Sequence, residues 1–234
     1  MAYTGEASPG GPADVRELDA LTIRKASVGP MDNNAYLLTC RRTGAQLLVD
    51  AAADADRLLE LIREGSPQAR LDGVVTTHRH GDHLGALTSI IAVTGARALA
   101  GADDAHAIAE AADVHVEGRL HHGATVPLGD LVLDVIALRG HTPGSIALAY
   151  REPAGAEAAD AVPGRTHLFT GDSLFPGGPG RTSDGDDFDS LMDDLQRRVF
   201  DTLPDETWVY PGHGRDTTLG AERPHLEEWR ARRW

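Results

Sequence analysis

The segment from Asp72 to Gly95 constrains the fold more than any other part of the chain. A β-branched run, DGVVTTH, passes directly into the turn HRHGDH and then into HLGALTSIIAVTG, which is predicted to be a helix. Within six residues the turn holds four side chains of the metal-ligand type, which are His78, His80, Asp82 and His83. Loops that follow strands commonly carry functional sites, and one tight turn can aim all four side chains inward.

Imidazole and carboxylate groups together are ligands that zinc prefers, while iron and manganese accept the same groups. Three more candidate ligands each follow a predicted strand: His141 in ALRGHTPGS, Asp172 in FTGDSLF and His213 in VYPGHG. Taken singly, each of these fits an ordinary polar loop residue. One zinc needs only three protein ligands and an open position, so seven candidates predict a site for two divalent ions. We expect Zn²⁺ there, with iron or manganese as the alternatives.

Strand-like and helix-like segments alternate through both halves of the chain. The expected strands are residues 21–27, 35–40, 46–50, 72–78, 131–138, 145–150, 166–172 and 207–214, and the expected helices are 54–65, 83–95, 103–113 and 187–200. The stretch 151–166, rich in Ala, Pro and Gly, is interpreted as a surface excursion between two strands. This order favours two sheets packed face to face with helices outside. No repeat and no second hydrophobic unit is visible, so we expect one domain over residues 1–234, with a short helical tail at about 220–234.

The charge and the amino-acid composition limit the kinds of binding partner that we expect. The formal net charge is −14 at pH 7 and Lys25 is the only lysine, which disfavours a nucleic-acid partner because neutralising phosphates needs a basic face. The start of the chain lacks the features of a signal peptide, and no segment approaches the length of a membrane span. Cys40 stands alone and is expected to be a buried thiol. We therefore expect a cytoplasmic protein that acts on a small molecule, without nucleic acid or membrane; the oligomeric state is left open.

The four motifs, in this order, resemble those of the metallo-β-lactamase fold hydrolases, and the resemblance extends over residues 20 to 215. It implies an α+β fold, a four-layer αββα sandwich. It also implies how the metals would be bound, with metal one on His78, His80 and His141, metal two on Asp82, His83 and His213, and Asp172 bridging both.

Within that family, GHTPGS and GDSLF are similar to the glyoxalase II branch, which hydrolyses thioesters, and to the persulfide dioxygenases. Glyoxalase II proteins carry a C-terminal helical domain that helps bind glutathione, and LGAERPHLEEWRARRW is expected to be too short for such a domain. Arg181 in GGPGRTS matches a basic position that contacts substrate in the group. The competing interpretation is a surface arginine paired with Asp184 or Asp186.

The expected function is a dinuclear-metal hydrolase that uses a metal-bound hydroxide, oriented by Asp82 as the catalytic residue, on a thioester of a low-molecular-weight thiol. A thiol with a pKa near about 8.5 leaves as a thiolate without a general acid, and the motifs contain no extra acid. The main alternative is a mononuclear-iron persulfide dioxygenase. Others are a β-lactamase-like or other ester or amide hydrolase, a ribonuclease of the same fold, which the acid excess disfavours, and a non-enzymatic scaffold. The other histidines, His106, His115, His121, His122, His167 and His225, are expected to be structural.

Overall fold

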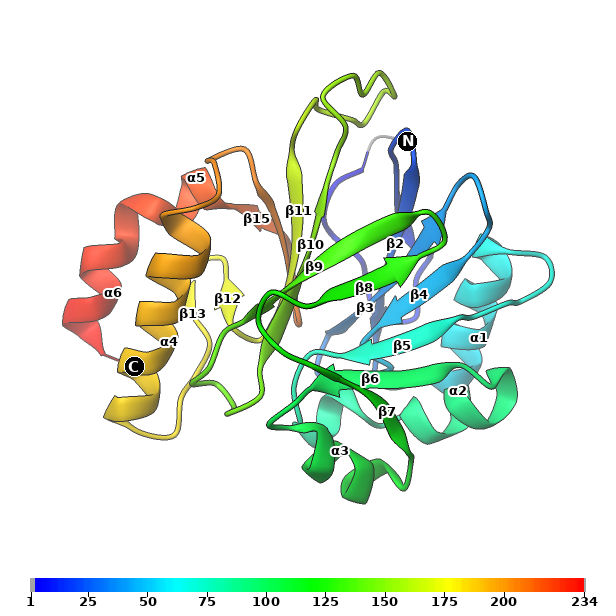
Figure 1. The fold of residues 1–234 in the computed structure, drawn as a ribbon, viewed down its shortest axis with the longest axis horizontal. Helices are drawn as coiled ribbons and strands as arrows, with labels where there is room; N and C mark the ends of the chain where they lie inside the picture. Colours follow the sequence, from blue (N-terminus) through cyan, green and yellow to red (C-terminus); the bar gives the residue numbers. More distant parts are fainter. Residues whose placement is uncertain (1–2, 234) are drawn as a thin grey trace.

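The computed structural model describes residues 3–233, which form two mixed β-sheets (Figure 1). The first sheet has the strand order β1-β2-β3-β4-β5-β6-β7 and the second the order β15-β14-β11-β10-β9-β8. The strands of the first sheet are β1 Asp14–Glu17, β2 Leu21–Val28, β3 Asn33–Cys40, β4 Gln46–Val49, β5 Gly73–Thr76, β6 Arg97–Gly101 and β7 Val116–Leu120. Those of the second are β8 Thr125–Leu128, β9 Leu131–Ala137, β10 Ile146–Arg151, β11 Thr166–Gly171, β14 Trp208–Pro211 and β15 Thr217–Thr218, and a small hairpin is formed by β12 Leu174–Phe175 and β13 Gly178–Pro179.

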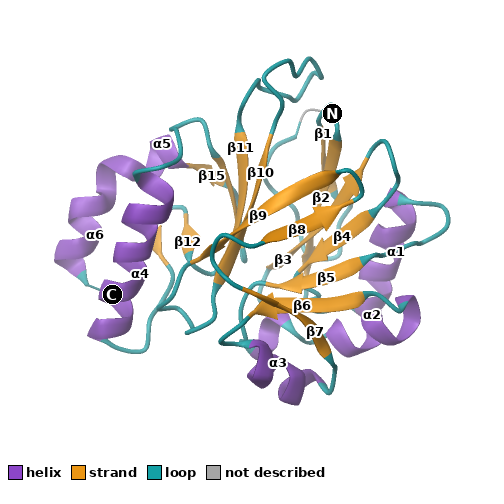
Figure 2. Ribbon diagram, viewed as in Figure 1, coloured by secondary structure: helices purple, strands orange, loops and turns teal. Residues whose placement is uncertain are grey.

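Helices lie on both outer sides of the sheet pair, as the purple ribbons in Figure 2 show. Three follow strands of the first sheet: α1 Ala55–Gly65, α2 Leu87–Thr94 and α3 Ala105–Ala112. The other three are α4 Gly185–Leu195, which continues into a π-helical turn at Gln196–Phe200, α5 Leu219–Glu222 and α6 Leu226–Arg232. Strands β4 to β7 run parallel, as do β11 and β14, and the helices between them make the return connections.

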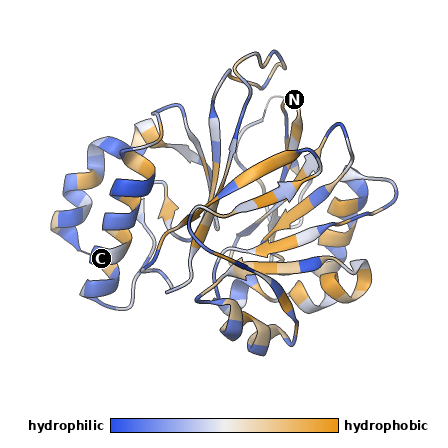
Figure 3. Cartoon of the chain, viewed as in Figure 1, coloured by the Kyte–Doolittle hydropathy of each residue, from blue (hydrophilic) through white to orange (hydrophobic). Residues whose placement is uncertain are grey.

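Side chains on the two faces of each central strand enter different hydrophobic cores. Leu48 packs towards α1 and α2, whereas its neighbour Leu47 faces the second sheet. Leu168 packs towards α4, whereas Phe169 faces the first sheet. Such strands are apolar on both faces, which explains the orange runs along them in Figure 3. Three cores between four layers confirm the expected α+β sandwich of αββα type.

Most expected elements are present, and the exceptions have a physical reason. The strands β1, β6, β7 and β8 were not predicted, nor were the two-residue strands β12, β13 and β15. β6 is rich in alanine and β7 carries alternating charged side chains, so both have weak β-propensity and depend on pairing with neighbours in the sheet. The expected helical tail divides into α5, a 3₁₀ turn at Arg223–His225 and α6, while Trp234 lies outside the described residues.

Other expectations can be compared with the structure directly. Residues 152–165 form the protruding loop between β10 and β11, at the top of Figure 1, as predicted. The Cys40 thiol is buried and lies 2.8 Å from Asp130 Oδ1. Along residues 3–233, no helix combines the length and the apolar character needed to span a bilayer. The single domain over residues 1–234 stays a prediction.

Candidate metal centre

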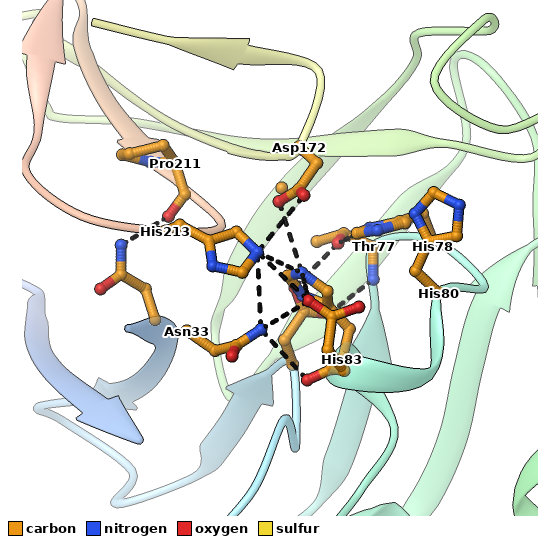
Figure 4. A network of polar contacts seen from close by, with 12 residues as sticks. Asn33, Thr77, His78, His80, His83, Asp172, Pro211 and His213 are labelled. Atoms are coloured by element: carbon orange, nitrogen blue, oxygen red, sulfur yellow. Dashed lines mark hydrogen bonds and ion pairs between the residues drawn. The ribbon is translucent and has the colours of Figure 1, made fainter. Parts of the chain in front are cut away.

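The seven candidate ligands come together at one edge of the sheet pair, in loops that follow strands of both sheets (Figure 4). His78 follows β5, and the next turn, a 3₁₀ helix at Gly81–His83, carries Asp82 and His83. His141 lies between β9 and β10, while Asp172 and His213 follow β11 and β14. The mixed topology brings these strand ends to the same edge, so residues far apart in sequence share one site.

The side chains form three overlapping groups in which every potential ligand atom lies within 4.8 Å of the others. The first group is His78, His80 and His141, the second is Asp82, His83 and His213, and the third is His78, His83 and Asp172. In the first group His80 Nδ1 is 2.9 Å from His141 Nε2. In the second group His83 Nε2 is 3.2 Å from His213 Nε2. Two nitrogens about 2.0 Å from one tetrahedral zinc would stand about 3.3 Å apart, so both spacings are close to that of a metal site.

Hydrogen bonds from the opposite ring nitrogen fix the tautomer of several imidazoles. His141 Nδ1 donates to the carbonyl oxygen of Arg181 at 2.7 Å, and His213 Nδ1 donates to that of Met31 at 2.9 Å. His83 Nδ1 donates to the carboxylate of Asp50 at 3.0 Å. Carbonyl and carboxylate oxygens only accept, so in the neutral form of each ring the lone pair lies on Nε2, where a metal can bind.

The same reasoning assigns the tautomer of the His78 ring. The Thr77 hydroxyl donates its one proton to Asp50 Oδ2 at 2.8 Å, so at 3.0 Å it must accept from His78 Nδ1. His78 Nε2 then carries a lone pair, and this buried atom has no hydrogen-bond partner within residues 3–233. A buried nitrogen left bare costs free energy unless something binds it, so it fits a metal ligand.

Asp172 lies between the two groups of ligands. Its Oδ1 is 3.4 Å from His83 Nε2, and its Oδ2 is 3.4 Å from His213 Nε2 and 3.7 Å from His141 Nε2. Oδ1 is buried and, in the described part of the chain, makes no hydrogen bond by the usual geometric criteria. The position at residue 212 must be glycine, because a Cβ there would stand 2.0 Å from Asp172 Oδ1. This carboxylate therefore reaches towards both groups.

The electrostatics of the metal-free site keep two imidazoles neutral, the Asp172 carboxyl ionised and His83 protonated. Burial and the neighbouring imidazoles hold the pKa of His78 well below its usual value, and burial also lowers the pKa of His141, so both rings stay neutral. Burial opposes ionisation of Asp172, but its close polar contacts with His213 and His83 outweigh burial and keep the pKa of this carboxyl far below its usual range. Burial likewise opposes charge on His83, but Asp50 and Asp172 outweigh it and raise its pKa to about 10.

Two supporting residues were not predicted. Asp50 anchors both Thr77, through its amide and its hydroxyl, and the ring of His83. Asn33 Nδ2 donates to Asp82 Oδ2 at 3.0 Å, which orients that carboxylate. The signal for Asp50 was a carboxylate directly after the apolar strand QLLVD, the same pattern that singled out Asp172. The amide of Asn33 gave no comparable signal.

The structure also places the remaining candidates. Arg181 is exposed, and within residues 3–233 its guanidinium forms no ion pair, so the pairing with Asp184 or Asp186 that the competing interpretation required is absent. A hollow of about 340 Å³ is lined by His80, His141, Arg181, Thr182 and Ser183. A larger hollow of about 700 Å³ beside α5 and α6 includes none of the candidate ligands.

The other histidines fit their structural interpretation. His167 is fully buried between Glu152 and the Tyr210 hydroxyl, each at 2.8 Å. The exposed ones are His106, His115, His121, His122 and His225. As far as residues 3–233 are concerned, none of these six joins a group that could hold a metal.

Comparisons with known proteins agree with this geometry. The chain is 35% identical to the hydroxyacylglutathione hydrolase of Fuscovulum blasticum over 182 residues, which cover 78% of this chain but only 62% of that relative. ETHE1 from Myxococcus xanthus is similar in structure, with 29% identity, a TM-score of 0.71 and coverage of 89% of this chain and 84% of that one. TTHA1623 in a di-iron-bound form has 28% identity, a TM-score of 0.62 and coverage of 84% and 95%. Residues 28–213 match the model of the metallo-beta-lactamase superfamily, and the chain belongs to that family.

Proposed function

We propose that the chain is a metal-dependent hydrolase that holds two divalent ions and cleaves a thioester of a low-molecular-weight thiol. The observation that carries the proposal is the pair of triads with the carboxylate of Asp172 between them, together with two buried ligand atoms, His78 Nε2 and Asp172 Oδ1, that have no hydrogen-bond partner within residues 3–233. Metal one would be held by His78, His80 and His141 and metal two by Asp82, His83 and His213, with Asp172 contributing to both. The similarity to a hydroxyacylglutathione hydrolase supports the hydrolytic chemistry.

Two ions in these positions would supply an activated water at neutral pH and polarise the carbonyl to be attacked. The protein holds the geometry for this chemistry. Asp82 is kept ionised, because hydrogen bonding from Asn33 and nearby His83 outweigh burial and lower its pKa. Its Oδ2 lies 3.3 Å from His213 Nε2, within the second triad, and the ionised carboxylate can accept a hydrogen bond that orients the water, which makes Asp82 the proposed catalytic residue.

The substrate would enter through the hollow lined by His80, His141, Arg181, Thr182 and Ser183. The lining includes no carboxylic acid and no lysine, and its two histidines are assigned to metal one, so a leaving group that needs a proton finds no free general acid among these residues. A thiolate needs none. The guanidinium of Arg181, which pairs with no acid among residues 3–233, is suited to a bidentate pair with a carboxylate of the thiol carrier.

The test combines metal analysis with a substrate panel. The purified protein is loaded with zinc, and its metal content is measured by atomic emission together with the rate of thiol release from a hydroxyacyl-glutathione thioester. We expect close to two metals per chain and thioester cleavage that stops when a chelator removes them. A protein that binds two metals but leaves every thioester of the panel intact would refute the proposed substrate class.

The mononuclear-iron persulfide dioxygenase remains the second candidate, and the similarity to ETHE1 supports keeping it in the test. A single tightly held iron that added zinc does not displace, together with oxygen uptake, would favour it. The crystal structure of TTHA1623 is that of a di-iron-bound form, so iron is tested beside zinc as the native metal of a two-metal hydrolase. The cytoplasmic location stays a prediction.

A further inference from the structure

Asp104 directly precedes α3 and is fully buried, yet its carboxylate caps no amide of that helix. An aspartate in this position ordinarily accepts a hydrogen bond from the first turn of its own helix. The Asp104 carboxylate instead accepts hydrogen bonds from two loops that carry the ligands of the proposed first metal. We propose that Asp104 is a positioning residue that holds His80 and His141 at metal-binding distance, an inference that rests on the proposed two-metal function.

Three donors converge on this carboxylate. Asp104 Oδ2 accepts from the amide of Arg79 at 3.0 Å and from the hydroxyl of Thr142 at 2.5 Å. Asp104 Oδ1 accepts from the amide of Gly144 at 3.0 Å. Arg79 lies between His78 and His80 after a strand of the first sheet, whereas Thr142 and Gly144 follow His141 in the second sheet. One buried side chain therefore joins two loops that come from different sheets.

Asp104 and Gly144 lie too close together to leave room for a side chain at residue 144. A Cβ at residue 144 would stand 2.2 Å from the backbone nitrogen of Asp104, which gives a physical reason for the second glycine of GHTPGS. Both carboxylate oxygens must accept. An asparagine has one accepting oxygen, and its NH₂ group would face one of the donors, either the Gly144 amide or the Arg79 and Thr142 pair.

The first triad depends on the hydrogen bonds to Asp104 more than the second triad does. Within the described residues, the only polar contact of the His80 ring is the one to His141, so its position follows from the backbone at Arg79. Each member of the second triad has its own anchor. His83 is held by Asp50, His213 by the carbonyl of Met31, and Asp82 by Asn33.

The experiment compares Asp104→Asn with the wild-type protein and with Asp194→Asn as the matched control. Asp194 is also buried and accepts hydrogen bonds from the same His141 loop, at the amide and the guanidinium of Arg139, but in the described part of the chain it forms no hydrogen bond or ion pair with the His78–His80 turn. The stepwise zinc affinities are measured by competition with a chelator of known affinity. Loss of a hydrogen-bonded partner behind a metal ligand typically costs about 10- to 100-fold in metal affinity. We expect that loss in Asp104→Asn for one of the two zinc ions only, and wild-type affinities in Asp194→Asn.

A second readout needs no metal. In the metal-free protein, hydrogen exchange at the amides of Arg79 and Gly144 should accelerate in Asp104→Asn and keep its wild-type rate in Asp194→Asn. Should Asp104→Asn fail to fold, Thr142→Val replaces the donating hydroxyl with a methyl group of nearly the same shape. A smaller loss of affinity for the same zinc ion is then expected.

Unchanged zinc affinities, an equal loss at both sites, or the same pattern in the control would overturn the role of Asp104. Failure of the proposed function has a different signature, because the wild-type protein would then bind fewer than two zinc ions or leave thioesters intact. The exchange rates at Arg79 and Gly144 would still decide whether Asp104 joins the two loops.

Discussion

Removal of the metals should make the stability of the protein depend on pH through His83. In the folded, metal-free protein the Asp50 and Asp172 carboxylates outweigh burial and raise the pKa of this ring from 6.5 to about 10. Between these two values the folded state holds a proton that the unfolded state has lost. The stabilisation is therefore fully present below pH 6.5 and is lost as the pH rises through about 10.

The size of the effect follows from one proton. The free energy of unfolding should fall by about 1.4 kcal/mol per pH unit, which is about 2 kcal/mol between about pH 7.5 and about pH 9. His213 adds a change of the same sign, because hydrogen bonding to Asp172 outweighs burial and raises its pKa too. Urea denaturation of the chelator-treated protein, followed by circular dichroism across this range, measures the slope.

Two controls isolate the cause. Zinc-loaded protein should show a much flatter dependence, because a metal-bound imidazole is neutral and exchanges no proton in this range. Asp50→Asn in the metal-free protein should also flatten the slope, since the neighbouring carboxylate is gone. A stability that rises with pH in the metal-free protein, or a slope identical with and without zinc, would refute the placement of a charged His83 between two carboxylates.

Three further predictions concern the proposed chemistry. Asp172→Ala should lower the content of both metals at once, measured by atomic emission after dialysis, because its carboxylate faces both groups; full metal content would exclude the bridging role. Arg181→Ala should raise KM for acidic thioesters by about tenfold, the equivalent of about 1.4 kcal/mol, and leave neutral thioesters and metal content unchanged. Equal effects on charged and neutral thioesters would contradict a role in binding the carboxylate. Thioesters should exceed nitrocefin in kcat/KM by about 100-fold or more, because a lactam nitrogen needs the proton that a general acid supplies; comparable values would argue against the thioester.

The sequence by itself determined the fold class and the candidate ligands. The candidate ligands and the arrangement of two sheets with outer helices rest on local patterns, namely apolar runs that end in His or Asp and a helix whose apolar face repeats with a period near 3.6 residues, while the αββα type came from the resemblance of the motifs to a known family. Four of the seven candidates lie within six residues, so their proximity needed no knowledge of the fold. Strands such as β6, in contrast, carry little propensity of their own and exist because neighbouring strands pair with them.

Only the tertiary structure decided how these residues are held. Asp50 and Asp104 lie far in sequence from the side chains that they anchor, and an isolated aspartate after a strand or before a helix has many other uses. Whether Arg181 forms an ion pair also depended on the fold, because the presence of Asp184 and Asp186 nearby in sequence does not bring their carboxylates within ion-pair distance. Hydrogen-bond partners depend on which groups lie close together in the folded chain. The chemical type of a ligand and the spacing of apolar residues along a strand can be taken from the sequence alone.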